Sequence, residues 1–168
     1  NLDIDFVTRH HYTTELPRRN GHYGYPPLSP AEDGFRNLHT TRDIIDSHEK
    51  YKGLPIHITE YNTSYIPNAP LHDTTKNAAY LAHQLSRLGD DNESYSYWTF
   101  GDIFEEWGVP FSVFHGGFGL VANGLIPKPT FWTFAFYKKL KDKALCCVLK
   151  ESDFEISSCL SSYCSAEA

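Results

Sequence analysis

The chain has 168 residues, of which 40% are apolar and 15% aromatic, so it can bury one ordinary hydrophobic core, and its length predicts a single domain. Its 15 basic and 21 acidic side chains give a formal charge of −6 without a basic stripe, which argues against nucleic-acid binding and favours a polar, neutral ligand. No apolar run approaches the roughly 20 residues that cross a bilayer, so we expect a soluble protein without a membrane partner, in a compartment that the sequence leaves open.

The first predicted strand and helix lie within residues 3–51. Alternating apolar residues and β-branching predict a strand over Asp3–Tyr12, which ends in histidines and a tyrosine. The following loop is long and rich in Gly, Pro and aromatic residues, which favours a functional loop or lid. Ser29, Pro30 and Glu32 match the N-cap, N1 and N3 positions of a helix. We therefore expect a helix from about Pro30 to Tyr51.

The second strand and helix follow with the same spacing. The β-prone stretch LPIHITEYN, Leu54–Asn62, predicts a strand that carries one carboxylate, Glu60, near its end. Because an ionised carboxylate is costly to bury without a partner, Glu60 must reach water or a polar pocket. Asp73 can cap a second helix, whose apolar residues recur at helical spacing until Gly89.

The third unit begins with a strand predicted over Ser94–Phe100. The loop Gly101–Lys128 contains HGGFG, which indicates a flexible loop rather than a phosphate cradle, because the lysine and hydroxyl residue of a P-loop are missing. Pro129 then opens a third helix, PTFWTFAFYKKL. From Ala144 the pattern breaks, and the serine-rich end predicts a tail or the remnant of an accessory β domain.

Three strand–loop–helix units with a period near 40 residues predict a parallel sheet of an α/β fold. In such folds, functional residues gather in the loops at the carboxyl ends of the strands. His10, Tyr12, Glu60 and Trp98 all fall there, so we expect them to converge on one mouth.

Histidines and cysteines offer no metal site by spacing. The set His10, His11, His22, His57 and His72 fits no compact ligand arrangement, and Cys146, Cys147, Cys159 and Cys164 match no standard zinc pattern. We therefore expect neither a metal nor another cofactor, and assign the cysteines no function.

Five blocks resemble the second half of the β-xylosidases of glycoside hydrolase family 39, in the same order and with similar spacing: DFVTRHHY, HITEYNTS, SYWTFGDIFEEWGVP, FHGGFGL and GLIPKPTFWTFAF. The resemblance covers about Asp3 to Leu140. It implies part of a (β/α)8 TIM barrel, corresponding to its strands six to eight with their helices. We accordingly assign residues 1–143 to this barrel part and residues 144–168 to the tail.

The resemblance also implies roles for individual residues. Retaining enzymes of this family use two carboxylates about 5 to 5.5 Å apart, one as nucleophile and the other as acid/base. By resemblance Glu60 is the nucleophile, kept ionised by neighbouring donors. The remaining matches concern the sugar: Tyr12 beside the carboxylate, His10 as a sugar ligand, Trp98 as an apolar floor, and Glu105 and Glu106 as acceptors for sugar hydroxyls.

One departure from the family changes the expected function. Its acid/base glutamate belongs to an Asn-Glu-Pro element on the fourth strand, and this sequence contains no such element. Since the chain also lacks methionine, we expect a piece of a longer product that needs the N-terminal barrel half as its partner. The leading hypothesis is a retaining β-xylosidase acting on xylo-oligosaccharides, of which this chain holds the nucleophile half.

Two other hypotheses stay open. A catalytically incomplete fragment could serve as a sugar-binding or structural module. A related barrel glycosidase such as an α-L-iduronidase is disfavoured, because Glu105 and Glu106 would repel a uronate carboxylate.

Overall fold

The computed structural model of the chain describes residues 3–16, 24–87, 89–102, 106–141, 143–145 and 164–166. In chain order, its elements are β1 (Val7–Tyr12), α1 (Ala31–Asp46), β2 (Ile56–Asn62), the short 3-10 helix η1 (Pro70–Asp73), α2 (Thr75–Leu85), β3 (Ser94–Tyr97), β4 (Val121–Ala122), β5 (Ile126–Pro127), α3 (Pro129–Tyr137), β6 (Lys143–Leu145) and β7 (Cys164–Ala166). The three predicted strands and three predicted helices are all present, each shorter than expected.

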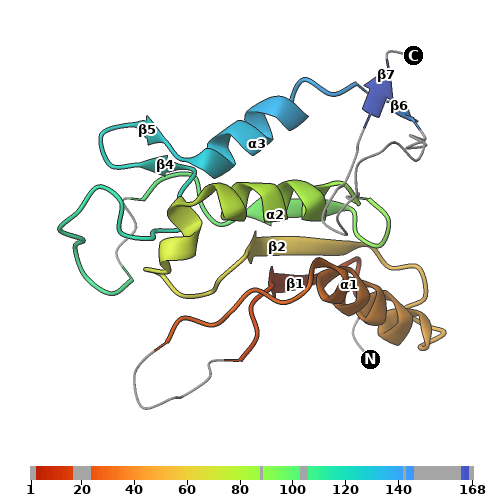
Figure 1. The fold of residues 1–168 in the computed structure, drawn as a ribbon. Helices are drawn as coiled ribbons and strands as arrows, with labels where there is room; N and C mark the ends of the chain where they lie inside the picture. Colours follow the sequence, from red (N-terminus) through yellow and green to blue (C-terminus); the bar gives the residue numbers. More distant parts are fainter. Residues whose placement is uncertain are drawn as a thin grey trace.

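Strands β1, β2 and β3 form a parallel sheet in that order, and α1 and α2 connect them (Figure 1). This arrangement confirms the α/β class with a parallel sheet. Helix α3 packs along α2, where the Thr133 hydroxyl donates to Ala78 O at 3.1 Å and the Tyr137 hydroxyl to Ala82 O at 2.7 Å. Closure of these units into part of a barrel stays a prediction.

Both ends of α1 differ from the predicted ones. Pro30 is its N-cap and no side chain caps it, because Ser29 instead pairs through its backbone with the loop that follows β1. The helix ends at Asp46 rather than at Tyr51. The Asp46 carboxylate accepts the Gly53 N–H at 2.9 Å, and Gly53 has φ +77°, so the chain folds back in turns before β2.

Helix α2 is capped by Thr74 and not by Asp73. The Thr74 hydroxyl accepts the Asn77 N–H at 3.2 Å, which satisfies one free donor of the first turn. Asp73 is the last residue of η1, and its carboxylate accepts a hydrogen bond from the backbone N–H of Gly116. At the other end, α2 stops at Leu85, four residues before Gly89, which adopts φ +94°.

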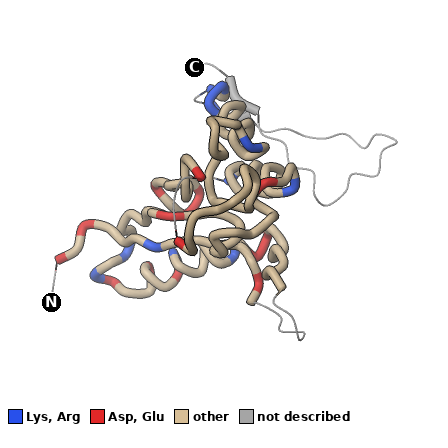
Figure 2. Tube along the Cα trace, turned by 90° about the vertical axis from the view of Figure 1, so that its left-hand side faces the viewer, with Lys and Arg blue, Asp and Glu red and all other residues tan. Residues whose placement is uncertain are grey.

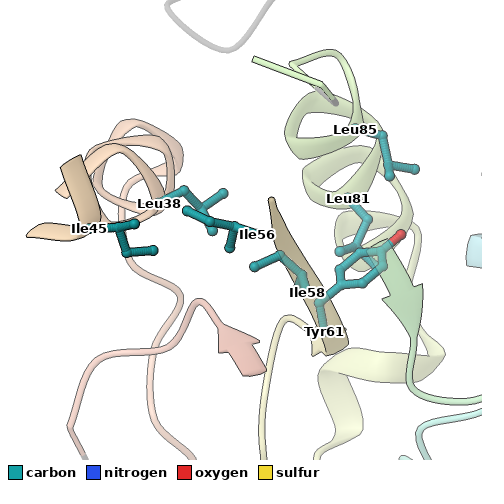
Figure 3. Close-up of a cluster of buried hydrophobic side chains, with 7 residues drawn as sticks. All are labelled: Leu38, Ile45, Ile56, Ile58, Tyr61, Leu81 and Leu85. Atoms are coloured by element: carbon teal, nitrogen blue, oxygen red, sulfur yellow. The ribbon is translucent and has the colours of Figure 1, made fainter. Parts of the chain in front are cut away.

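The hydrophobic core lies between the sheet and its two connecting helices (Figure 3). It joins side chains of α1, β2 and α2, namely Leu38, Ile45, Ile56, Ile58, Tyr61, Leu81 and Leu85. On the opposite face of the sheet, the side chains of Thr8, His10, Thr59, Ser94 and Ser96 are exposed. We call this second side the open face of the sheet. The five exposed residues are polar, whereas the β2 residues on the helix-covered face, Ile56, Ile58 and Tyr61, belong to the hydrophobic core.

Charged residues are interspersed over the described part of the chain, with Lys and Arg lying among Asp and Glu (Figure 2). Some oppositely charged side chains pair within one helix: in α1, Arg36 lies 2.7 Å from Asp33 and Arg42 lies 3.3 Å from Asp46. None of the helices in the described part is long and apolar enough to cross a membrane.

The C-terminal region contributes one antiparallel pair of strands, in which Lys143 to Leu145 of β6 face Ala166 to Cys164 of β7. Cys164 begins β7, whereas Cys146, Cys147 and Cys159 lie outside the described residues. The boundary between residues 143 and 144 stays a prediction.

Candidate functional site

An irregularity in the central strand decides where Glu60 points. Ile56 and Ile58 of β2 are fully buried against the helices, and strict alternation would send Glu60 to the same face. The pairing with β1 instead passes from Ile58 directly to Glu60, and the pairing with β3 places three steps of β2 against two of β3. One extra residue in β2 therefore reverses the alternation, so Tyr61 enters the core while Glu60 lies with the open face.

Two residues of β1 contact the Glu60 carboxylate. The Tyr12 hydroxyl donates a hydrogen bond to Oε1, and Nδ1 of His10 lies 3.5 Å from Oε2. His10 is the direct strand partner of Glu60, which explains why two residues 50 positions apart meet. The Glu60 side chain is 20% exposed and that of His10 59%, so the carboxylate is sheltered but accessible.

Tyr12 stays a hydrogen-bond donor because its pKa is raised. Burial is the largest cause, followed by the hydrogen bond to Glu60, the charge of Glu60 and the charge of Glu106. A protonated phenol that donates to one carboxylate oxygen orients that carboxylate, whose other oxygen faces His10.

Trp98 follows β3 directly and stands beside the end of β2. Its backbone N–H donates to Tyr61 O at 3.0 Å, and its backbone carbonyl accepts a hydrogen bond from the Asn62 side-chain amide at 2.7 Å. Asn62 is 1% exposed and also bonds the Tyr97 hydroxyl at 3.1 Å, so it fixes the exit of β3 relative to Glu60. Asn62 is a functional neighbour that the sequence analysis did not select.

The structure thus brings four of the six predicted site residues to the same edge of the sheet: His10, Tyr12, Glu60 and Trp98. Glu106 is exposed, and its place in the site stays a prediction. Glu105 lies outside the described residues. Among the described residues, no group of three or more His, Cys, Asp or Glu side chains is placed to hold a metal ion.

The HGGFG segment is not the flexible loop that its composition predicted. Gly116 to Gly119 are buried, and a Cβ at Gly117 or Gly119 would stand within 2.6 Å of Asp102 atoms. The segment is held by Asp73, Asp102 and the fully buried Lys128. Sequence reasoning missed this cluster, because its residues lie far apart in the chain and each resembles an ordinary surface charge.

The carboxylate of Glu60, the phenol of Tyr12 and the imidazole of His10 meet at the end of a parallel sheet. The phenol donates a hydrogen bond to the carboxylate, and a carboxylate of this kind is chemically able to act as a nucleophile or to stabilise a positive charge.

The chain is similar to known glycosyl hydrolases. The model of the glycosyl hydrolases family 39 matches residues 1–163. A β-xylosidase of Geobacillus stearothermophilus is 50% identical over 147 residues, and a β-xylosidase of Caldicellulosiruptor saccharolyticus is 33% identical over 145 residues. These alignments cover 86% of this chain and 29% of each relative.

Among solved structures, the crystal structure of a monomeric β-xylosidase from Caulobacter crescentus CB15 superposes with a TM-score of 0.78 at 34% identity. The superposition covers 87% of this chain and 30% of that protein. The chain therefore spans about three tenths of the length of the proteins it matches. Since the family model matches almost the whole sequence, the chain belongs to the glycosyl hydrolases of family 39.

Proposed function

We propose that this chain supplies the nucleophile half of a retaining β-xylosidase that acts on xylo-oligosaccharides. Glu60 attacks the anomeric carbon and forms a covalent glycosyl–enzyme, which water then hydrolyses with the help of a second carboxylic acid. Tyr12 orients Glu60, His10 and Glu106 bind sugar hydroxyls, and Trp98 lies under the sugar ring. Glu105 is proposed as a second hydroxyl acceptor from the same segment.

The observation that carries the proposal is the contact of Tyr12 and His10 with the two oxygens of Glu60 on the open face of the sheet. The direction of this carboxylate is fixed by the Tyr12 hydrogen bond, and its side chain is partly exposed to solvent. The names of the similar proteins add support, since those relatives are β-xylosidases.

The second carboxylic acid must come from a polypeptide region beyond these 168 residues. The sequence contains no Asn-Glu-Pro element, and the matched relatives are more than three times as long as the part aligned here. We therefore propose the N-terminal barrel half as the partner of this chain, and expect the 168 residues alone to release no xylose.

The test uses the chain completed with that N-terminal half, which we call the completed enzyme. A 2-deoxy-2-fluoro aryl β-xyloside should form a stable adduct, and peptide mass spectrometry should locate it on Glu60. Glu60→Gln should lower kcat on an aryl β-xyloside by at least about 1,000-fold, while the exposed control Glu49→Gln should not. An adduct on another residue, or normal turnover by Glu60→Gln, would refute the assignment.

A further inference from the structure

The ammonium group of Lys128 is surrounded by acceptor atoms inside the protein. Nζ lies 2.6 Å from Asp73 Oδ1, 2.9 Å from Asp102 Oδ2 and 2.7 Å from Gly117 O. The ammonium donates hydrogen bonds to Asp102 Oδ2 and Gly117 O, and it forms an ion pair with Asp73 Oδ1 that lacks hydrogen-bond geometry. Lys128 is 0% exposed, and a buried charge of this kind persists only where its partners are fixed.

The partners of Lys128 come from different loops at the carboxyl ends of the strands. Asp73 lies in the connection that follows β2, whereas Asp102 and Gly117 lie in the connection that follows β3. The second oxygen of each aspartate also accepts a glycine N–H at 2.6 Å, Asp73 from Gly116 and Asp102 from Gly119. One cation therefore holds two aspartates, and these hold the glycine segment.

Glu106 belongs to the described residues 106–114, which lie in the sequence between Asp102 and Gly116. Within the described residues 106–114, most side chains are exposed, including Trp107 at 63% and Phe111, which is fully exposed. Such a segment has few packing contacts of its own, so its two ends largely determine where it stands. Asp102 fixes the first end and Gly116 to Gly119 the second, and both depend on Lys128.

The position of Glu106 matters to the function proposed above, in which Glu106 binds sugar hydroxyls beside Glu60. We propose that Lys128 is a positioning residue: through Asp73, Asp102 and Gly117 it fixes both ends of the segment that carries Glu106 and thereby sets the distance of that carboxylate from the sugar. The consequence for hydrolysis rests on the function proposed above. The consequence for the segment itself does not.

The first experiment measures kinetics of the completed enzyme on an aryl β-xyloside, with active sites counted by titration. Lys128→Met should raise KM about tenfold and change kcat less than about threefold, because it disturbs a sugar ligand and not the nucleophile. The exposed lysine variant Lys76→Met is the matched control and should leave both constants unchanged.

A double-mutant cycle separates positioning from general damage. If Lys128 acts through Glu106, Lys128→Met should add less than about twofold to KM once Glu106→Gln is present. If the effects of the two substitutions on KM multiply in the double variant, the proposal is overturned. Should Lys128→Met not fold, Asp73→Asn, which weakens the same cluster while preserving its volume, takes its place in the cycle with the same expectations.

The second experiment needs no activity. Hydrogen exchange of the completed enzyme should be faster at residues 106–119 in Lys128→Met and unchanged across β2. Equal acceleration in both regions, or no acceleration at residues 106–119, would overturn the positioning role. If the wild-type enzyme hydrolyses no xyloside, the proposed function fails, and this exchange pattern still decides the structural part.

Discussion

Two buried histidines should make the protein lose stability as the pH falls. His11 is 5% exposed and His72 1% exposed. Burial is the main reason why the pKa of each is lowered from 6.5 to about 4, with the charge of Arg9 as a further cause at His11. Between about pH 4 and pH 6.5 the two histidines bind protons in the unfolded chain but not in the folded one. The free energy of unfolding therefore decreases as the solution is acidified from about pH 6.5.

The size of this effect follows from the pKa difference. A difference of about 2.5 corresponds to about 3 kcal/mol for each histidine once the pH lies below both values. From about pH 7 to about pH 5.5, the linkage relation gives a loss of about 1 kcal/mol for each, or about 2 kcal/mol together. The exposed His39, whose pKa is raised by its hydrogen bond to Asp91, changes stability in the opposite direction.

The assay is urea unfolding followed by circular dichroism at these two pH values. Among the described residues, neither ring nitrogen of His11 has a hydrogen-bond partner. His11→Leu therefore breaks no side-chain hydrogen bond and removes one of the two titrating groups. We expect this variant to lose about 1 kcal/mol instead of about 2. The exposed His48→Leu is the control and should behave as the wild type, including the contribution of His39. A full loss in His11→Leu would refute the reasoning.

Three further predictions concern the site and its support. Tyr12→Phe removes the donor to Glu60 and should lower kcat of the completed enzyme about 10-fold to 100-fold on an aryl β-xyloside, as expected for a charge-assisted hydrogen bond of about 1.5 to 3 kcal/mol; an unchanged kcat would contradict this role. Asn77→Leu removes the hydrogen bonds that Asn77 makes with the buried hydroxyls of Thr63 and Thr130, so the free energy of unfolding should fall by about 2 kcal/mol in a urea titration. A fall below about 0.5 kcal/mol would contradict this expectation. Ile58→Ala empties a fully buried position and should cost about 2 to 5 kcal/mol in the same titration; a smaller cost would mean that the core collapses around the vacancy.

The sequence by itself determined the order of strands and helices, and with it the edge of the sheet at which functional residues gather. Periodicity and turn residues depend on local geometry, which a short stretch of sequence records. Helix ends were predicted less well, because they depend on contacts made after folding. Asp46 closing onto Gly53 is one such contact, and it shortens α1 at its C-terminal end.

Only the tertiary structure decided where Glu60 points. Its sequence position has the same parity as Ile56 and Ile58, so the pattern alone would bury it. The extra residue in β2 is visible only through pairing with two neighbouring strands, and it turns the carboxylate toward Tyr12 and His10. Likewise, Lys128 joins Asp73 and Asp102 across 55 and 26 positions, a cluster that no local pattern encodes because a buried charge is defined by the partners that surround it.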